Sequence, residues 1–357
     1  MGWMSSAEST VDQAGVARAG GWCRAAIIGL ALALLSAPAG AESEPQFFRI
    51  GTGAVDSPSF AVGGLIAAGL SNPPGTRPCD RGGSCGVPGM IALAQALGSA
   101  AEAIDLLETR QIDAIVVPAG DAQAALTAKH PEPPKGAPPA KPREPLRTVG
   151  TLFIEAVHVA VREGTRYETI DDLKRRLVAT ASDDPTAAPF AQLVAGQFGF
   201  EAARKAPMLP VAAALQKLAE SRVEALVIVE PVPAPALVEL TRTTPIRLLV
   251  VPALKPAPPY LAEVKLPAGT YGNSEALDLP GQPIQLYVAA GADPDRVEAI
   301  TRALWNDATL KLLSAGPPAA RAVKLERALA GVAVPLHPGA ARVYREAGIL
   351  NNAPVGQ

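Results

Sequence analysis

Two glycines close to the beginning of an apolar pattern form the first candidate for binding chemistry. Gly51 and Gly53 follow the short strand pattern Phe47–Ile50. Glycine lets a chain turn tightly and lets its backbone approach a ligand closely. This segment predicts a backbone-lined binding turn that includes Gly53, although the same glycines are also typical of a βα turn with no ligand.

Small polar side chains come next, at the expected start of a helix. Asp56, Ser57 and Ser59 precede the apolar run Phe60–Leu70, whose spacing predicts a helix. A helix N-terminus offers free backbone N–H groups and the positive end of a dipole to an anion. We therefore expect Ser57, Ser59 and Phe60 to contact a ligand, with a carboxylate as the natural guest.

A similar turn occurs in the second half of the chain. The segment Ser182–Thr186 follows the strand pattern Leu177–Ala181 and precedes the helical pattern Ala187–Phe198. Its hydroxyl and amide groups place Ser182, Asp183, Asp184 and Thr186 among the candidate ligand contacts. The two aspartates either face the ligand or serve as helix N-terminal caps.

Three further polar residues follow strand patterns or begin a helix pattern. Ser99 begins the helical pattern Gly98–Arg110, Asp121 follows the strand Ile112–Val117, and Glu230 follows the strand Ala225–Val229. Ligands of parallel sheets bind beyond the carboxyl ends of the strands. We count these three as candidate ligand contacts, while Glu230 also fits a solvated loop acid.

The elements that carry these residues alternate between strand and helix. The first half reads β-α-β-α-β from Phe47 to Val117, and a unit of the same design follows between Leu177 and Val229. This order is typical of an α/β fold in which mainly parallel sheets are flanked by helices. With 357 residues, two such units are the expected organisation.

Composition and motifs exclude several classes of function. The chain has 32 Lys and Arg against 34 Asp and Glu, without a basic stripe, so we expect no nucleic-acid partner. It contains no G-x-S-x-G, H-E-x-x-H, Walker or G-x-G-x-x-G motif and only three histidines. We expect no enzyme, no catalytic residues, no cofactor and no metal site.

The N-terminal 41 residues have the features of a signal peptide. Arg18 and Arg24 precede the apolar run Ala25–Leu35, and small residues end the segment at Ala41. The apolar run is short for a membrane span. We expect cleavage of residues 1–41 and a periplasmic protein, with a retained anchor as the alternative.

Two cysteines remain after that cleavage, Cys79 and Cys85, in a glycine-rich loop. An even number of cysteines in an exported protein is typical of disulfide pairing. We expect one disulfide between them, which fixes the shape of a small loop.

Several segments resemble one family of transport receptors. GTGAVDSPSFAVGGLI, SNPPGTRPCDRGGSCGVPGMIALAQ, EAVHVAVR and PLHPGA are similar to segments of the TAXI proteins, the extracytoplasmic solute receptors of one branch of the TRAP transporters. The resemblance implies a two-lobed, type II periplasmic-binding-protein fold. It also implies a small organic acid or amino acid bound between the lobes, and delivery of that solute to a TRAP-type membrane permease by a monomeric receptor.

The same resemblance implies the lobe boundaries and one more site residue. Residues 42–154 begin the first lobe, 155–268 form the second, and 269–357 return to the first. Leu266–Tyr271 matches the family's segment before the second crossover, so Tyr271 borders the ligand or packs between the lobes.

The second turn departs from the family pattern. TAXI receptors have a Ser-Gly-Thr turn where this chain has Asp183, Asp184 and Pro185. Two added carboxylates repel an anionic guest. A cationic or zwitterionic solute becomes possible, as does a degenerate pocket in a sensor or scaffold of the same fold; a hydrolase is the least supported alternative.

Overall fold

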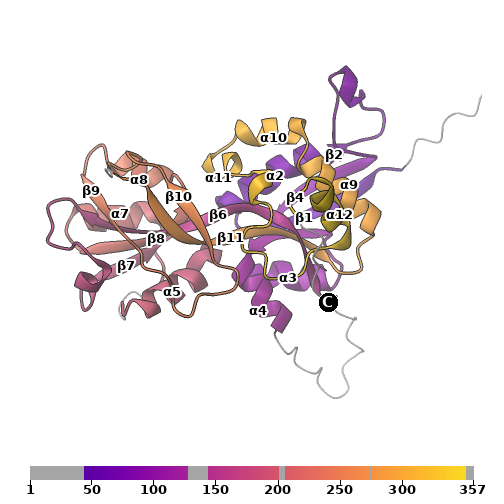
Figure 1. The fold of residues 1–357 in the computed structure, drawn as a ribbon. Coiled ribbons are helices and arrows are strands. Elements are labelled where there is room, and N and C mark those ends of the chain that lie inside the picture. The colour runs from indigo at the N-terminus through magenta and orange to yellow at the C-terminus, as the bar shows by residue number, and fades with distance from the viewer. Residues whose placement is uncertain (1–43, 128–143, 201–205, 273–274, 351–357) are drawn as a thin grey trace, which may run out of the picture. The chain divides into compact units, whose positions relative to one another are not determined.

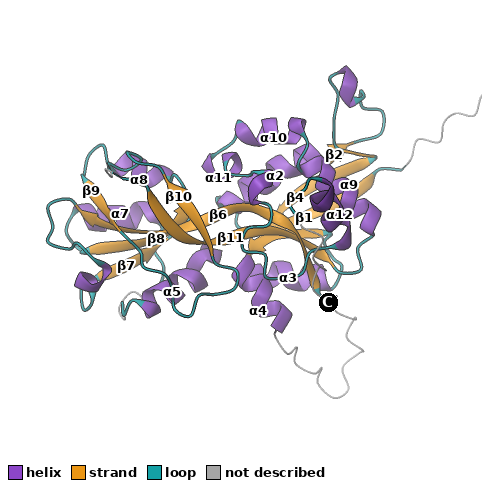
Figure 2. Ribbon diagram, viewed as in Figure 1, coloured by secondary structure: helices purple, strands orange, loops and turns teal. Residues whose placement is uncertain are grey.

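The computed structural model describes residues 44–127, 144–200, 206–272 and 275–350. The predicted signal peptide, residues 1–41, lies outside these ranges. Among the described residues, no helix combines the length and the apolar character needed to cross a membrane. Figure 1 shows how the elements are arranged, and Figure 2 shows helices packed on both faces of one long sheet.

The elements up to the first crossover fall in this order: β1 (Gln46–Thr52), α2 (Pro58–Leu70), β2 (Ser71–Asn72), the short 3-10 helix η1 (Cys79–Arg81), β3 (Val87–Pro88), β4 (Met90–Ala96), α3 (Ala100–Glu108), β5 (Ala114–Pro118), α4 (Ala119–Thr127) and β6 (Leu146–Arg162).

The middle of the chain contains η2 (Ile170–Leu173), β7 (Val178–Ala181), η3 (Pro185–Ala187), α5 (Ala188–Gln197), α7 (Val211–Ala219), β8 (Ala225–Pro231), α8 (Pro235–Leu240), β9 (Ile246–Leu249) and β10 (Ala262–Leu266).

The return segment contains β11 (Leu277–Ala289), α9 (Pro294–Leu304), α10 (Asp307–Ser314), α11 (Pro318–Arg321), η4 (Leu325–Arg327) and α12 (Pro338–Glu346).

Nine strands form one continuous sheet. Seven follow the order β4-β1-β5-β11-β6-β8-β7, while β10 pairs with β11 and β9 pairs with β6. Strands β1, β4 and β5 are mutually parallel, as are β7 and β8. Strands β6 and β11 run antiparallel to their neighbours and to each other. These two long strands join the parallel parts of the sheet.

The buried apolar residues divide the molecule into two lobes. One pair of core clusters joins residues before Phe153 to residues after Ile284, on the two faces of the β4-β1-β5 part of the sheet. Another pair lies between Ile154 and Leu279, on the two faces of the β8-β7 part. The two-lobed α/β class predicted from the sequence is therefore confirmed. We call these parts the first and the second lobe.

Helix α2 shows how local sequence positions the site. Ser57 has an extended backbone, and its hydroxyl accepts a hydrogen bond from the backbone N–H of Phe60. Pro58 occupies the first turn, where its missing N–H costs nothing. Val62, Ile66 and Leu70 are fully buried against the sheet. The helix therefore begins at the edge between the lobes with its N-terminus fixed in place.

The structure corrects several sequence-based boundaries. Helix α4 was not predicted from the sequence; it starts at Ala119, directly after β5, because its alanine-rich sequence favours a helix. Strand β11 was expected from Ile284 and starts at Leu277 instead. Two prolines in the first half of β11 made this part of the chain look unlike a strand. The register of the pairing between β11 and β6 shifts next to Ile284, close to these prolines. Elements α8, β10, α10 and α11 were also not predicted.

The predicted disulfide is present. Cys79 and Cys85 are bonded across the small loop that contains η1. The side chain of Asn306, which caps α10, donates a hydrogen bond to the carbonyl oxygen of Cys85. The disulfide loop is thereby tied to the first lobe.

A buried tyrosine holds the C-terminal helix on the first lobe. The hydroxyl of Tyr344 donates to the carbonyl oxygen of Val149 at 2.7 Å and accepts from the indole N–H of Trp305 at 3.0 Å. Tyr344 is 0% exposed. Both partners lose a buried hydrogen bond if this hydroxyl is removed.

We predict that Cys79 and Cys85 form an intramolecular disulfide in the exported protein. Intact-mass measurement before and after reduction should differ by two hydrogens. Two free thiols in freshly isolated exported protein would contradict the pairing.

We predict that Tyr344→Phe lowers the free energy of unfolding by about 1–3 kcal/mol, because it leaves a buried carbonyl and a buried N–H without a partner. Chemical denaturation measures the change. Tyr167→Phe is the matched control, since Tyr167 is also buried and its change should stay within about 0.5 kcal/mol. Equal effects of the two substitutions would contradict the role of the Tyr344 hydroxyl.

Candidate functional site

The turn after β1 faces the second lobe at very short range. A Cβ atom at Gly53 would lie 2.6 Å from the Ser57 hydroxyl and 3.4 Å from a carboxylate oxygen of Asp184. Only glycine fits between these groups without displacing one of them. Gly53 thus allows the first-lobe turn to meet Asp184.

The second-lobe turn is held by its own side chains. Asp184 caps η3, and its Oδ1 accepts from the backbone N–H of Thr186 at 2.9 Å and from the Thr186 hydroxyl at 2.7 Å. The Oδ1 atom of Asp183 accepts from the N–H of Val211, the first residue of α7. Both aspartates therefore serve helix N-termini, which was one of the two roles expected for them.

Glu230 completes this turn from the end of β8. Its Oε1 accepts from the Ser182 hydroxyl at 3.1 Å and from the backbone N–H of Asp183 at 2.9 Å. Glu230 is 7% exposed and Ser182 is 6% exposed. Of the two roles considered for Glu230, a ligand contact or a solvated loop acid, its burial is incompatible with the second.

A hydrogen bond joins the two lobes across this region. The hydroxyl of Ser59 in α2 donates to Oδ2 of Asp184 at 3.3 Å. Ser59 is 1% exposed and Asp184 is 0% exposed. The two predicted half-sites therefore meet directly, and the structure has the lobes in contact.

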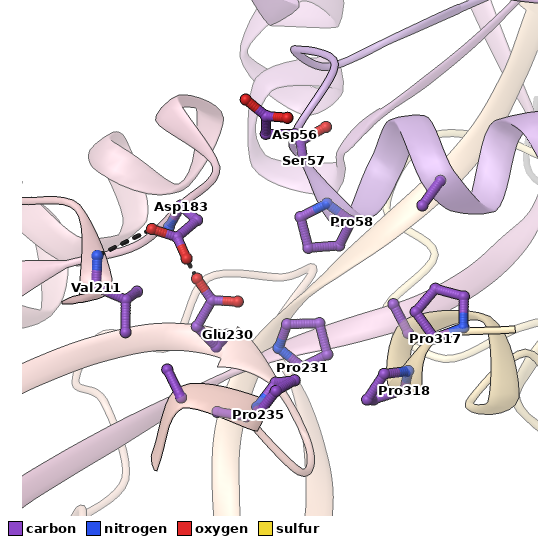
Figure 3. A pocket seen from close by; sticks show the side chains of 14 residues that line it. Asp56, Ser57, Pro58, Asp183, Val211, Glu230, Pro231, Pro235, Pro317 and Pro318 are labelled. Atoms are coloured by element: carbon purple, nitrogen blue, oxygen red, sulfur yellow. Dashed lines mark hydrogen bonds between the residues drawn. The ribbon is translucent and has the colours of Figure 1, made fainter. Parts of the chain in front are cut away.

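Two cavities flank this contact. The first, of about 280 Å³, is lined by the start of α2, the carboxyl end of β8, the start of α8, and α11. The second, of about 470 Å³, lies beside Ser182 and Pro185. Asp56 and Asp183 line both. Figure 3 shows Asp183 and Glu230 together on the second-lobe side of the first cavity, with Asp56 and Ser57 across from them.

A further carboxylate is buried between the lobes, and sequence analysis missed it. Glu155 lies in β6, is 0% exposed, and its Oε2 accepts from the side-chain amide of Gln282 at 3.0 Å. Its Oε1 is buried without a hydrogen-bond partner. The one available signal was a glutamate inside a run of apolar strand residues.

Burial and mutual repulsion raise the pKa values of these acids. Loss of solvent raises the pKa of Glu230 to about 7 and that of Asp121 to about 6, and the charge of Asp184 adds to both effects. Burial also raises the pKa of Glu155 well above its ordinary value, with Asp184 as the strongest charged neighbour. Part of this group is therefore protonated near neutral pH.

The remaining predicted residues lie at the periphery of the site or behind it. Ser99 caps α3 and is exposed, and it does not line either cavity. Phe60 is partly buried in the first turn of α2. The hydroxyl of Tyr271 accepts from the N–H of Ala234, a cavity-lining residue, and lies 3.3 Å from Nε2 of the buried His158. Tyr271 thus supports the cavity wall from behind.

The described residues contain no cluster of His, Cys, Asp and Glu side chains with the geometry of a metal site. The two cavities are lined by carboxylates, serine hydroxyls and small apolar side chains. This arrangement suits the enclosure of a small polar molecule.

We predict that the ligand-free protein melts at its highest temperature near pH 5 and loses stability toward pH 8. A folded-state pKa raised above the unfolded value binds protons more tightly in the folded state, so its stabilisation is complete below the unfolded pKa and disappears as pH rises through the folded pKa. For Glu230 the window runs from 4.5 to about 7. The expected loss is on the order of 2–3 kcal/mol.

Calorimetric melting across this range measures the effect. Glu230→Gln retains an acceptor for Ser182 and should flatten the decline, whereas Glu263→Gln, at an exposed position of β10, should leave it unchanged. A melting temperature that rises from pH 5 to pH 8 would contradict the burial of ionisable acids between the lobes.

Comparison with known proteins found several similar solved structures and one matching family. Among similar solved structures are a periplasmic sulfonate-binding protein SsuA from Methylobacillus flagellatus KT (12% identity, 78% of this chain and 76% of that chain, TM-score 0.44) and a TctC solute-binding protein from Polaromonas (12% identity, 79% and 87%, TM-score 0.44). Another is the arginine-, lysine-, histidine-binding protein ArtJ from Geobacillus stearothermophilus (11% identity, 77% and 99%, TM-score 0.40).

The described part of the chain has a two-lobed, mixed α/β fold. The model of the NMT1-like family matches residues 135–348, which include all of β6, the whole second lobe and most of the return to the first lobe. Since this match spans more than half of the sequence, the chain belongs to the NMT1-like family.

Proposed function

We propose that this protein is an exported solute receptor that encloses a small molecule between its two lobes and delivers it to a membrane permease. The observation that carries the proposal is the meeting of two helix-start turns across the cleft, where Ser59 of one lobe contacts Asp184 of the other. Neither lobe encloses the site alone. Binding therefore couples to lobe closure.

The connections between the lobes support such a motion. Only the long strands β6 and β11 continue from one part of the sheet to the other, and each lobe has its own buried cores. Two rigid bodies joined by a narrow connection are typical of hinge closure around a ligand. The cavity of about 280 Å³ fits a solute of a few to about ten heavy atoms.

The finer assignment rests on the sequence resemblance described above. We propose a TAXI-type receptor of a TRAP transporter, periplasmic after removal of residues 1–41 and monomeric, with a small organic acid or amino acid as its solute. Gly53, Ser57, Ser59, Asp184 and Glu230 form the core of the proposed site.

We predict that a bound solute lowers the radius of gyration measured by small-angle X-ray scattering.

Ser59→Ala removes the hydrogen bond that joins the lobes and should weaken solute binding about 3- to 10-fold, in line with about 1 kcal/mol for a neutral donor to a carboxylate. The matched control is Ser314→Ala, at an exposed position of α10.

An identical scattering profile with and without saturating solute would contradict closure. That result would favour a sensor or scaffold that has the same fold and does not move its lobes on binding.

A further inference from the structure

The contact between the lobes contains four carboxylates that come from four different elements. Asp121 belongs to α4, Glu155 to β6, Asp184 caps η3, and Glu230 lies near the end of β8. We call these four residues the acidic centre. Each of the other three raises the pKa of Glu155 by its charge, so all three lie within electrostatic reach of Glu155.

Hydrogen-bond donors of the protein satisfy only part of the acidic centre. Asp184 accepts from Ser59 and Thr186, and Glu230 accepts from Ser182 and the backbone of Asp183. The buried carboxylate oxygen that receives no hydrogen bond belongs to Glu155.

Glu155 has one oxygen bonded to Gln282, while its Oε1 is completely buried and has no partner. A buried carboxylate oxygen without a hydrogen-bond donor destabilises the folded protein. This unpaired oxygen is independent evidence that a donor is missing from the centre.

No side chain in the described part of the chain neutralises the centre. The charged groups that change the pKa values of Asp121, Glu155 and Glu230 are all carboxylates. The residues around the first cavity include Asp56, Asp183 and Glu230 but no Lys, Arg or His. Without a cation, the acids of the centre are neutralised only by binding protons, and a cation that enters the site can replace those protons.

A metal ion does not fit this need, because the described acids do not gather into a metal-binding group. An ammonium group does. It carries one positive charge, presents three N–H donors, and tolerates acceptors that are spread around it.

Resting on the proposed receptor function, we propose that the solute is an amine: its ammonium group binds in the first cavity beside Glu230, and the negative charges of Asp184 and of Glu155, which pairs with Pro231 across β6 and β8, hold it there. The solute is therefore an amino acid or a small amine, and a simple organic acid without an amino group is excluded.

The cavity walls fit the rest of such a molecule. Pro58, Pro231 and Ala234 line the first cavity with small apolar surfaces that suit a short carbon chain. The N-terminus of α2, capped by Ser57, faces the same cavity and suits the carboxylate of an amino acid. An amino acid would thus present opposite charges to opposite lobes.

Binding of an ammonium group should also move protons. Besides the four acids, the charged or titratable groups that interact with the centre are Asp183 in the second-lobe turn, Tyr260 before β10, Tyr271, and Tyr287 in β11. The pKa values of all three tyrosines are raised, so these side chains stay neutral below pH 9. Burial raises the pKa values of Asp121, Glu155 and Glu230, so these acids should release protons when the ammonium group binds, and amine affinity should rise with pH.

The experiment compares matched pairs of probes by isothermal titration calorimetry at pH 7.5. The pairs are L-alanine with L-lactate, L-aspartate with L-malate, and 1,4-diaminobutane with succinate. We expect the amine member of at least one pair to bind at least tenfold more tightly than its partner. Titration in two buffers of different ionisation enthalpy should reveal proton release, and affinity should rise from pH 5.5 to pH 7.5.

Substitutions test whether the acidic centre is responsible for amine binding. Glu155→Gln keeps the shape and removes the charge, and it should weaken amine binding at least tenfold and reduce proton release. Glu263→Gln removes one exposed carboxylate of β10 and should change the affinity less than twofold. Melting curves of both variants establish that each is folded, and Glu230→Gln provides a second test if Glu155→Gln does not fold.

The outcomes separate the two proposals. If lactate, malate or succinate binds as tightly as its amine partner, or binds more tightly after Glu155→Gln, the ammonium proposal is wrong and the receptor function stands. If none of the six probes binds and the scattering profile does not change with any of them, both proposals are contradicted.

Discussion

The removal of carboxylates from water between the two lobes is the physical constraint on which the site depends. Glu155 and Asp184 are 0% exposed, and the charge of one opposes ionisation of the other. Such burial is costly unless donors and a counter-charge are supplied. The protein supplies donors to Asp184 and Glu230 but leaves one oxygen of Glu155 unpaired. A ligand that supplies a hydrogen-bond donor and a positive charge would stabilise the contact between the lobes. Ligand binding would thereby favour the closed arrangement.

The sheet makes this arrangement possible. Strands β6 and β11 lie between the parallel strands of the two lobes, so the carboxyl ends of β1, β5, β7 and β8 point toward a shared region. Glu155 and Gln282 are paired across β6 and β11 and form part of the connection itself. Glu155, which belongs to the proposed site, is therefore part of the connection between the lobes, with Asp121 on the first-lobe side and Asp184 and Glu230 on the second-lobe side.

Much of this architecture was predictable from local pattern. The cap at Ser57, the helix α2 and the turn Ser182–Thr186 follow from residue types whose side chains bond their own backbone. The place of Glu155 in the site was not predictable. A single glutamate in a long apolar strand does not reveal which face of the sheet its side chain occupies or which residues pack against it. The early start of β11 was hidden by Pro280 and Pro283, whose placement in a strand depends on the tertiary register.

The most direct measurement is identification by mass spectrometry of the small molecule released from the protein after purification from its native source without added solute. The account predicts one small solute per chain that carries a primary or secondary amine, in a protein whose lobes are closed. A stoichiometric solute with carboxylates and no basic nitrogen would contradict it, because such a molecule adds negative charge to a site that already buries three acids and partly buries a fourth.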